Sequence, residues 1–298
     1  MPEFGRLLTA MVTPFAADGS LDYDAAKQLA LALIDSGSDG LVVAGTTGEA
    51  PTLTHDEKLR LVAEVKAAVG GRGTVIAGTG TNNTAESVEL TREAARTGVD
   101  GVLAVTPYYN KPPQEGLFRH FQAIAEATSL PLILYNLPGR TCINMTDETT
   151  IRLSQIENIA GIKESSGDLG QIARIVEGVR DGFRVWSGAD EDTLPMLAAG
   201  CYGVISVASH LVGRQLRAMI EDHVGGKTDA AARAHRRLLP LIDVLFCVTN
   251  PIPLKYALRQ LGVPVGEPRL PLCEPDEATG ARIMAEVRRH QIDLPVAV

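Results

Sequence analysis

The chain has 298 residues, of which 45% are hydrophobic and 21% charged, and its formal net charge is −8. This length suits one large domain, alone or with a small appendage. An acidic chain with no basic stripe interleaved with aromatic residues argues against a nucleic-acid partner. No apolar stretch is long enough to span a bilayer, which argues against a membrane protein.

The cysteines indicate a reducing compartment. Cys142, Cys201, Cys247 and Cys273 are far apart and form no C-x-x-C pair. This spacing is more typical of free thiols than of a disulfide framework. The first eight residues lack a basic region followed by a long apolar run, so we expect no signal peptide and a cytoplasmic location.

Short apolar runs rich in β-branched residues alternate with longer amphipathic runs over most of the chain. The short runs predict strands at Leu7–Thr13, Gly40–Gly45, Thr74–Gly80, Gly101–Thr106, Leu132–Asn136, Ile159–Lys163, Arg184–Ser187 and Gly203–Val207. The longer runs predict helices at Tyr23–Ser36, His55–Val69, Ala85–Thr97, Gln114–Thr128, Asp147–Gln155, Gly170–Val179, Glu191–Ala199 and Leu211–His223.

Eight strands that alternate with eight helices predict an α/β fold with a parallel sheet, closed into a (β/α)₈ TIM barrel. A doubly wound open sheet is the alternative. It would need a glycine-rich phosphate loop after the first strand, and Thr13-Pro14-Phe15 is not such a loop.

Strand patterns stop near Gly225. Three further helices are predicted, at Ala230–Val248, Pro253–Leu261 and Pro275–His290. We therefore expect a barrel catalytic domain over residues 1–224 and a C-terminal helical domain, a three-helix appendage, over residues 225–298.

The active sites of barrels lie at the carboxyl ends of the strands, so the residues that follow each predicted strand are the candidates. These segments are rich in hydroxyl groups and contain a single lysine. They lack the histidines and paired carboxylates of a metal site, so we expect no metal. The segments are Gly45–Glu49, Thr106–Asn110, Tyr135–Thr141, Gly161–Ser165 and Ser187–Asp190.

Lys163 is the strongest candidate for a catalytic residue. Of seven lysines it alone closes an apolar strand, and the others fall in helical or loop patterns. Burial disfavours the ammonium form and frees the amine to attack a carbonyl carbon, as in Schiff-base enzymes. The alternative is an ion pair with Glu164, but neighbours in a strand point to opposite faces.

Two other strand ends offer three kinds of supporting group, each with a structural alternative. Tyr135 could relay protons to the adduct on Lys163, or its ring could belong to the core. Thr46 and Thr47 could hold a substrate carboxylate, or cap a helix. Arg140 could bind a second carboxylate through its forked guanidinium, or lie free in a surface loop.

The sequence resembles the dihydrodipicolinate synthase/N-acetylneuraminate lyase family nearly end to end. The resemblance rests on Gly45-Thr46-Thr47-Gly48-Glu49, Tyr108-Tyr109, Tyr135-Asn136-x-Pro138-x-Arg140-Thr141 and Gly161-Ile162-Lys163-Glu164. It extends from Thr9-Ala10-Met11-Val12-Thr13-Pro14-Phe15 to Asn250-Pro251-Ile252-Pro253-Leu254-Lys255.

The resemblance implies condensation of pyruvate with L-aspartate 4-semialdehyde in lysine and diaminopimelate biosynthesis, without a cofactor. It implies an imine on Lys163, with Tyr135, Thr47 and Tyr109 as a hydroxyl relay. The residue matching Tyr109 enters the site of a neighbouring subunit, which implies a homodimer or homotetramer. The implied substrate-binding residues are Thr46, Thr47, Arg140, Gly188 and Ile205.

Feedback-inhibited members of the family bind lysine in a pocket between subunits. The matching positions here are Ala50, His55, Lys58, Asn82, Glu86 and Tyr108. A histidine commonly stands where this chain has Lys58, whose ammonium would repel that of lysine. We therefore expect weak or absent inhibition by lysine.

Two other functions stay open. The nearer one is another pyruvate-dependent aldolase of the same family, such as a sialic acid lyase, a 2-keto-3-deoxy sugar acid aldolase or a hydroxy-oxoglutarate aldolase. Arg140 and the pair of Thr47 and Tyr109 favour the condensing enzyme. The remoter one is a barrel that binds pyruvate without turnover.

Overall fold

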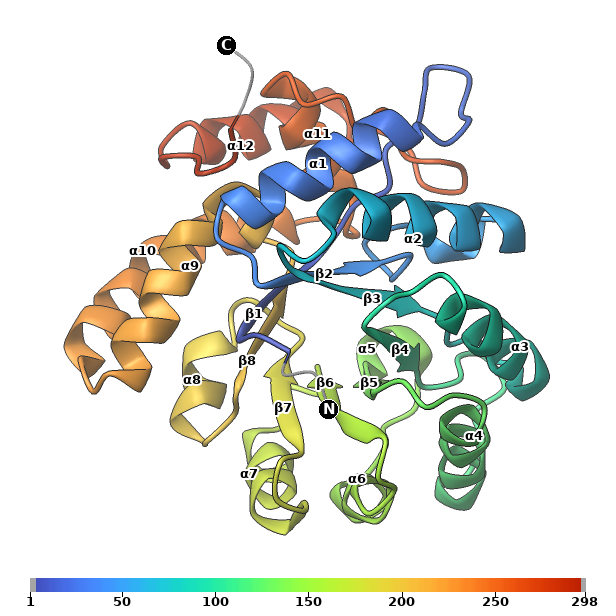
Figure 1. Cartoon of the computed structure of the whole chain (residues 1–298). Helices are drawn as coiled ribbons and strands as arrows, with labels where there is room; N and C mark the ends of the chain where they lie inside the picture. Colours follow the sequence, from blue (N-terminus) through green and yellow to red (C-terminus); the bar gives the residue numbers. More distant parts are fainter. Residues whose placement is uncertain (1–3, 296–298) are drawn as a thin grey trace.

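A computed structural model describes residues 4–295 of the chain. Its centre is a barrel of parallel strands in sequential order, closed by pairing of the last strand with the first (Figure 1). The strands are β1 (Leu7–Ala10), β2 (Gly40–Val43), β3 (Thr74–Gly78), β4 (Gly101–Val105), β5 (Leu132–Asn136), β6 (Ile159–Glu164), β7 (Arg184–Ser187) and β8 (Gly203–Ser206).

Helices connect the strands and form the outer layer. Within the described residues, the predicted TIM barrel is confirmed. The helices are α1 (Tyr23–Asp35), α2 (His55–Val69), α3 (Thr84–Ala95), α4 (Gln114–Glu126), α5 (Pro138–Thr141), α6 (Asp147–Ser154), α7 (Leu169–Gly178), α8 (Thr193–Ala198), α9 (Ser209–Val224), α10 (Thr228–Leu245), α11 (Ile252–Gln260) and α12 (Glu277–Val287), with a 3₁₀ turn, η1 (Ala50–Thr52).

Local sequence explains where the helices begin. Asp22 caps α1 by accepting a hydrogen bond from the amide of Ala25. Thr54 and Glu57 form a capping box at the start of α2, which satisfies two amides that the helix leaves free. The short helix α5 was not predicted, because four residues are too few to show a helical period.

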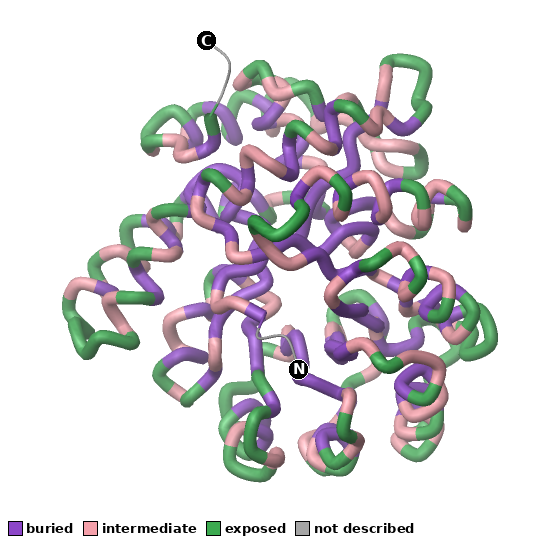
Figure 2. Tube along the Cα trace, in the orientation of Figure 1, coloured by how far each residue is buried: buried purple, intermediate pink, exposed green. Residues whose placement is uncertain are grey.

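The buried residues form two layers. Figure 2 shows that buried residues gather toward the centre of the molecule and exposed ones on the outer helices. One layer fills the barrel and includes Leu8, Ile76, Ile133, Trp186 and Ile205. The other lies between the strands and the helices. The interior is therefore a packed core, and a ligand site has room only at an end of the barrel.

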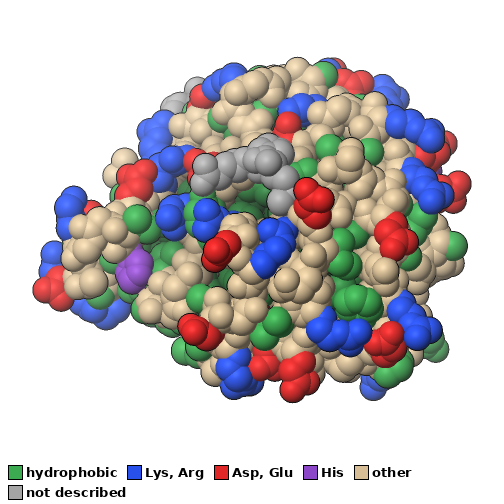
Figure 3. Space-filling view, turned by 60° about the horizontal axis from the view of Figure 1, so that its bottom comes forward, with side chains coloured by type: hydrophobic (Ala, Val, Ile, Leu, Met, Phe, Trp, Pro, Cys, Tyr) green, Lys and Arg blue, Asp and Glu red, His purple; other side chains and the backbone are tan. Residues whose placement is uncertain are grey.

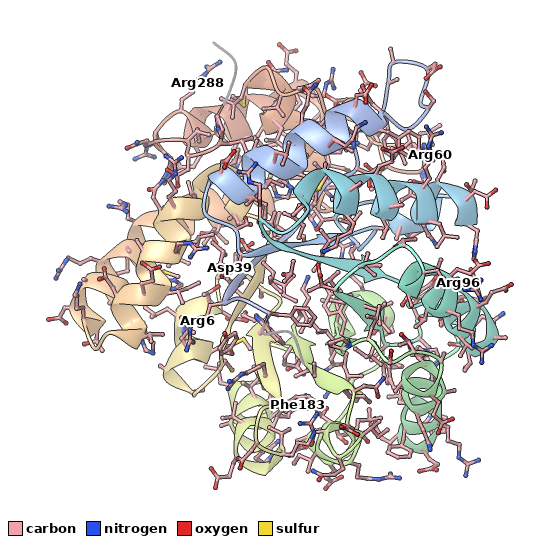
Figure 4. The ribbon with its side chains drawn as sticks, in the orientation of Figure 1. Arg6, Asp39, Arg60, Arg96, Phe183 and Arg288 are labelled. Carbon is pink, nitrogen blue, oxygen red and sulfur yellow. The ribbon has the colours of Figure 1, made fainter. Side chains whose placement is uncertain are left out.

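Figures 1 and 4 view the barrel from the amino ends of its strands. Arg6, Asp39 and Phe183, each directly before a strand, lie around this opening in Figure 4, whereas Arg60 and Arg96 lie on the outer helices. The carboxyl ends of the strands are on the far side. Acidic and basic side chains are interspersed over the face in Figure 3.

The last three helices lie where the sequence predicts them. α10 packs against α9 and α12, and the segment after α11 lies next to α1 (Figure 1). The division of the chain into two domains after residue 224 stays a prediction. Residues 1–3 of the first predicted domain and residues 296–298 of the second lie outside the described part of the chain. No helix among residues 4–295 is long and apolar enough to cross a membrane.

Candidate active site

Lys163 and Tyr135 lie side by side at the carboxyl ends of β6 and β5. The two residues are direct partners in the strand register, and both are buried, each with 5% of its surface exposed. The Nζ atom of Lys163 lies 4.3 Å from the centre of the Tyr135 ring. The phenol and the amine thus share one environment, as a proton relay to an adduct on Lys163 requires.

Glu164 points away from Lys163, as alternation along a strand demands. Its carboxylate accepts hydrogen bonds from the side-chain amide of Asn136, at 3.1 Å to each oxygen, and from the amide of Ser166, at 2.7 Å. Burial raises the pKa of Glu164, against these hydrogen bonds, which lower it. No ion pair joins Glu164 to Lys163 in the described chain, so the amine is not held by its neighbour.

Gly188, directly after β7, packs on the aliphatic stem of Lys163. A Cβ atom at position 188 would lie 2.9 Å from Cε of Lys163 and 2.0 Å from Oγ of Ser165. Only glycine leaves space for the lysine side chain here. Ile205, on β8, is fully buried in the barrel interior in the same cluster as Tyr135.

A fully buried carboxylate supports this side of the site. Asp190 accepts hydrogen bonds from Oγ of Ser206 and from the amides of Val207, at 2.8 Å, and Ala208, at 3.0 Å. It thereby joins the end of β7 to the end of β8. Burial raises the pKa of Asp190, whereas these hydrogen bonds and the charge of Lys163 lower it.

Thr46 and Thr47 occupy a tight turn after β2. Ala44 and Glu49, at its two ends, both have a φ of +56°, a strained conformation for residues other than glycine. Thr46 is half-buried, whereas Thr47 is 2% exposed. The Oγ1 atom of Thr47 accepts a hydrogen bond of 3.0 Å from the side-chain amide of Asn250.

The glutamate that ends this turn is anchored far along the chain. Glu49 is fully buried, and its Oε1 lies 2.8 Å from Nζ of Lys255, which is also fully buried. Its other oxygen accepts a hydrogen bond of 2.8 Å from the amide of Arg269. The main-chain oxygens of Thr13 and Glu267 accept the remaining hydrogen bonds of Lys255, each at 3.1 Å.

Arg140 lies on α5 rather than in the loop that the sequence suggests. The residue is exposed, and its Nη2 donates a hydrogen bond of 3.0 Å to the carbonyl oxygen of Asn250. No carboxylate within the described residues pairs with its guanidinium. Its remaining donors are therefore available to an anion from solution.

Tyr109 is not brought to the other relay candidates within the chain. Its side chain is 91% exposed, and its φ of +73° is strained for a tyrosine. Within residues 4–295 its hydroxyl has no hydrogen-bond partner. The predicted relay of Thr47, Tyr135 and Tyr109 is thus not formed within a single chain, and the entry of Tyr109 into a neighbour stays a prediction.

A cavity of about 250 Å³ opens beside these strand ends. Thr46, Tyr135 and Arg140 line it, so Tyr135 both contacts Lys163 and faces the cavity. The other predicted site residues, Thr47, Tyr109, Lys163, Gly188 and Ile205, are not among its lining residues.

The predicted regulatory pocket overlaps this cavity. Ala50, Lys58 and Tyr108 line the same space as Tyr135 and Arg140. The remaining members also have partners outside the cavity: the ring of His55 is hydrogen-bonded to Glu93, the carbonyl oxygen of Asn82 accepts from Asn110, and Glu86 accepts from Thr81. The charge of Glu86 also acts on Lys58 and Tyr108.

One residue at the site, Asn250, was missed in the sequence, and one strand-end residue, Ser165, was given no role there. Asn250 contacts both Thr47 and Arg140, and Ser165 presents a buried hydroxyl without a partner in the described residues. Asn250 stands in the N-P-I-P-L-K segment, which carries no chemical signature of its own. Ser165 follows the strand of Lys163 and was in view as a strand-end hydroxyl. No cluster of potential metal ligands occurs in residues 4–295.

Comparisons with known proteins agree over nearly the whole chain. The model of the Dihydrodipicolinate synthetase family matches residues 3–290. A 4-hydroxy-tetrahydrodipicolinate synthase of Dehalococcoides mccartyi is 61% identical over 296 residues, which cover 99% of this chain and 100% of the relative.

Solved structures that resemble this chain are also dihydrodipicolinate synthases. The dihydrodipicolinate synthase DapA-2 of Bacillus anthracis superposes with a TM-score of 0.95 at 45% identity, covering 97% of this chain and 99% of that one. The enzyme of Cyanidioschyzon merolae, solved with lysine bound, gives 0.94 at 48% identity, covering 96% and 97%. The chain belongs to the dihydrodipicolinate synthetase family.

Proposed function

We propose that this chain condenses pyruvate with L-aspartate 4-semialdehyde to 4-hydroxy-tetrahydrodipicolinate, through an imine on Lys163. The observation that carries this proposal is the 61% identity, over 99% of the chain, to a synthase of that name. The buried amine beside Tyr135 supports the imine chemistry.

The chemistry follows from an amine and a ketone. Nζ of Lys163 attacks the keto carbon of pyruvate, and loss of water gives an imine. The protonated imine withdraws electrons, so the methyl group loses a proton and becomes an enamine. The enamine carbon attacks the aldehyde, whose oxygen takes up a proton. The amine of the semialdehyde then displaces Lys163 and closes the ring, with a net loss of one water.

The protons in these steps need a carrier, and Tyr135 is the group beside Lys163. In our proposal Thr47 and the Tyr109 of a neighbouring copy complete the relay. Such a relay requires at least two copies, so in this proposal the protein acts as a homodimer or as a homotetramer. Its proposed location is the cytoplasm. The 91% exposure of Tyr109 supports this assembly, because a large aromatic side chain projecting into solvent is available to enter another chain.

In this proposal the carboxylates of the two substrates bind to different residues. The turn at Thr46 and Thr47 binds the carboxylate of pyruvate through hydroxyl and amide groups. Arg140, which lines the cavity and has no acidic partner in the described residues, binds that of the semialdehyde. Gly188 and Ile205 form part of the wall of the space that surrounds the adduct on Lys163.

Side-by-side assays test the function. The purified protein should form the cyclic product from pyruvate and L-aspartate 4-semialdehyde, and should not cleave sialic acid or 2-keto-3-deoxy sugar acids at a comparable rate. Borohydride with pyruvate should add one reduced pyruvate to the chain, at the peptide that contains Lys163. Faster sugar-acid cleavage would favour the other aldolases, and an adduct without turnover would favour a pyruvate-binding barrel.

Lysine is expected to inhibit this enzyme weakly or not at all. The half-buried Lys58 lines the cavity, and burial lowers its pKa whereas the charge of Glu86 raises it. A cation in this position repels the ammonium of lysine. Steady-state rates with increasing lysine measure the effect. Lys58→Gln should increase sensitivity, and the remote Lys27→Gln should not, whereas strong inhibition of the unmodified enzyme by sub-millimolar lysine contradicts the prediction.

A further inference from the structure

We infer that the hydroxyl of Ser165 accepts a hydrogen bond from the protonated imine that pyruvate forms on Lys163. The inference rests on the proposed function, because it assigns a partner to the nitrogen of that adduct. Ser165 directly follows β6, and its Oγ atom is buried without a hydrogen-bond partner among residues 4–295. Folded proteins seldom leave a buried polar atom in this state, so the unpaired hydroxyl is a candidate for contact with a ligand.

Ser165 and Lys163 lie on the same face of the chain. They are two positions apart, and alternation along a strand turns such side chains the same way. The pairing of the strands continues past the end of β6, because the amide of Ser165 donates a hydrogen bond of 2.9 Å to the carbonyl oxygen of Asn136. Glu164, between the two, faces the other way and accepts from the side-chain amide of Asn136. Ser165 therefore presents its hydroxyl on the side of the amine.

Gly188 shows how close the two side chains are. A Cβ atom at position 188 would lie 2.0 Å from Oγ of Ser165 and 2.9 Å from both Cγ and Cε of Lys163. The serine hydroxyl and the lysine stem thus surround a single point that only glycine leaves open. The reactive nitrogen is one bond beyond Cε, so the hydroxyl lies beside the arm that carries the adduct.

The protonated imine needs an acceptor for its N–H group. Nζ of Lys163 makes no hydrogen bond to the described residues and lies 4.3 Å from the centre of the Tyr135 ring. A buried cationic group is costly unless it is hydrogen-bonded. Glu164 faces away, and Asp190 already accepts three hydrogen bonds. The hydroxyl of Ser165 is buried, unpaired and next to the lysine stem, so it can accept this hydrogen bond.

Such a hydrogen bond has a chemical effect on the adduct. An acceptor that binds the protonated form stabilises it and raises the pKa of the imine. The methyl group of bound pyruvate loses its proton readily only while the imine is protonated. The hydroxyl therefore keeps the adduct reactive toward higher pH. It can still donate its own proton to an oxygen of the substrate, because a hydroxyl both donates and accepts.

Ser165→Ala tests the inference by removing the hydroxyl and little else. We expect the exchange of the pyruvate methyl protons with D₂O, followed by NMR without the semialdehyde, to slow about 10-fold, the scale of one hydrogen bond to a charged group. The kcat for the condensation should fall by no more than this factor. Borohydride should still trap pyruvate on Lys163, because the nucleophile is unchanged.

Two readouts separate this role from a structural one. The loss in methyl exchange should grow as the pH rises, because the imine in the variant loses its proton at a lower pH than the imine in the unmodified enzyme. The midpoint of thermal unfolding should stay the same or rise, because Ser165→Ala removes a buried hydroxyl that has no partner in the described chain. A serine that only supports the barrel would give a lower midpoint and a loss independent of pH.

Ser166→Ala is the matched control, one position along the chain. Oγ of Ser166 accepts a hydrogen bond of 3.3 Å from the amide of Asp168, in the loop before α7. The variant keeps the main-chain amide that donates to Glu164. Its rate of methyl exchange and its pH profile should match those of the unmodified enzyme.

The outcomes distinguish the inference from the proposed function. An unmodified protein without synthase activity overturns the proposed function itself. An active enzyme in which Ser165→Ala leaves methyl exchange unchanged, or slows it equally at every pH, overturns the inference. So does a Ser165→Ala variant that exchanges the methyl protons at the normal rate but condenses slowly, because the hydroxyl would then act on the aldehyde rather than on the imine.

Discussion

Lys163→Ala is expected to abolish the borohydride-stable adduct with pyruvate and to lower kcat for the condensation by about 10⁴-fold or more, the scale of a lost essential nucleophile. Among residues 4–295 no other buried amine lies beside Tyr135, whose ring centre is 4.3 Å from Nζ of Lys163. Mass spectrometry of the trapped protein measures the adduct, and a steady-state assay with both substrates measures kcat.

The matched control is Lys227→Ala, at a lysine whose side chain is 72% exposed and lies at the start of α10. This variant should form the adduct and turn over at the unmodified rate. A mass gain that survives Lys163→Ala would assign the imine to another lysine. Thermal unfolding of both variants checks that the barrel is intact.

Lys255→Met is expected to destabilise the protein by about 3–5 kcal/mol, because it leaves the carboxylate of Glu49 buried without its cation. Lys255 and Glu49 are both fully buried, and their charged atoms lie 2.8 Å apart. Burial lowers the pKa of Lys255, and the charge of Glu49 opposes this. For a chain of this size the midpoint of thermal unfolding should fall by about 5–10 °C.

Two comparisons isolate the unpaired charge as the cause. Adding Glu49→Gln to Lys255→Met removes the charge and should recover a large part of the lost stability. Lys27→Met breaks an exposed ion pair with Asp24 and should cost no more than about 1 kcal/mol. A midpoint for Lys255→Met equal to that of Lys27→Met would show that the buried pair contributes little.

The barrel could be predicted from the sequence because each strand and helix leaves a pattern within its own few residues. Each strand of a parallel barrel is covered on both faces, so it appears as a short apolar run such as Leu132–Asn136, whose bounds were predicted correctly. Lys163 stands out for the same reason, since a charged residue that closes such a run is unusual. Its pairing with Tyr135 follows from the sequential order of the strands.

The contacts between distant segments could not be predicted in this way. The bonds from Asn250 to Thr47 and from Lys255 to Glu49 depend on how α11 docks on the barrel, and no periodicity encodes that docking. Glu49 appeared in the sequence only as part of a turn motif. Its burial against Lys255 is a property of the tertiary structure alone.

The exposure of Arg140 and the shape of the cavity also depend on tertiary structure. A four-residue helix carries Arg140, and the bond to the carbonyl oxygen of Asn250 fixes its guanidinium. Sequence order also gave no indication that Lys58 and Arg140 face a common space, because the first lies on α2 and the second follows β5.

The long sequence separation between Thr47 and Asn250 has a consequence for the nascent chain on the ribosome. Extending the chain over the 203 positions from Thr47 to Asn250 takes about 10–40 s at 5–20 residues per second. During that interval the turn after β2 exists without the amide that donates a hydrogen bond to Thr47 and without the cation that pairs with Glu49. The contacts of this turn are therefore completed late, when α11 has left the exit tunnel.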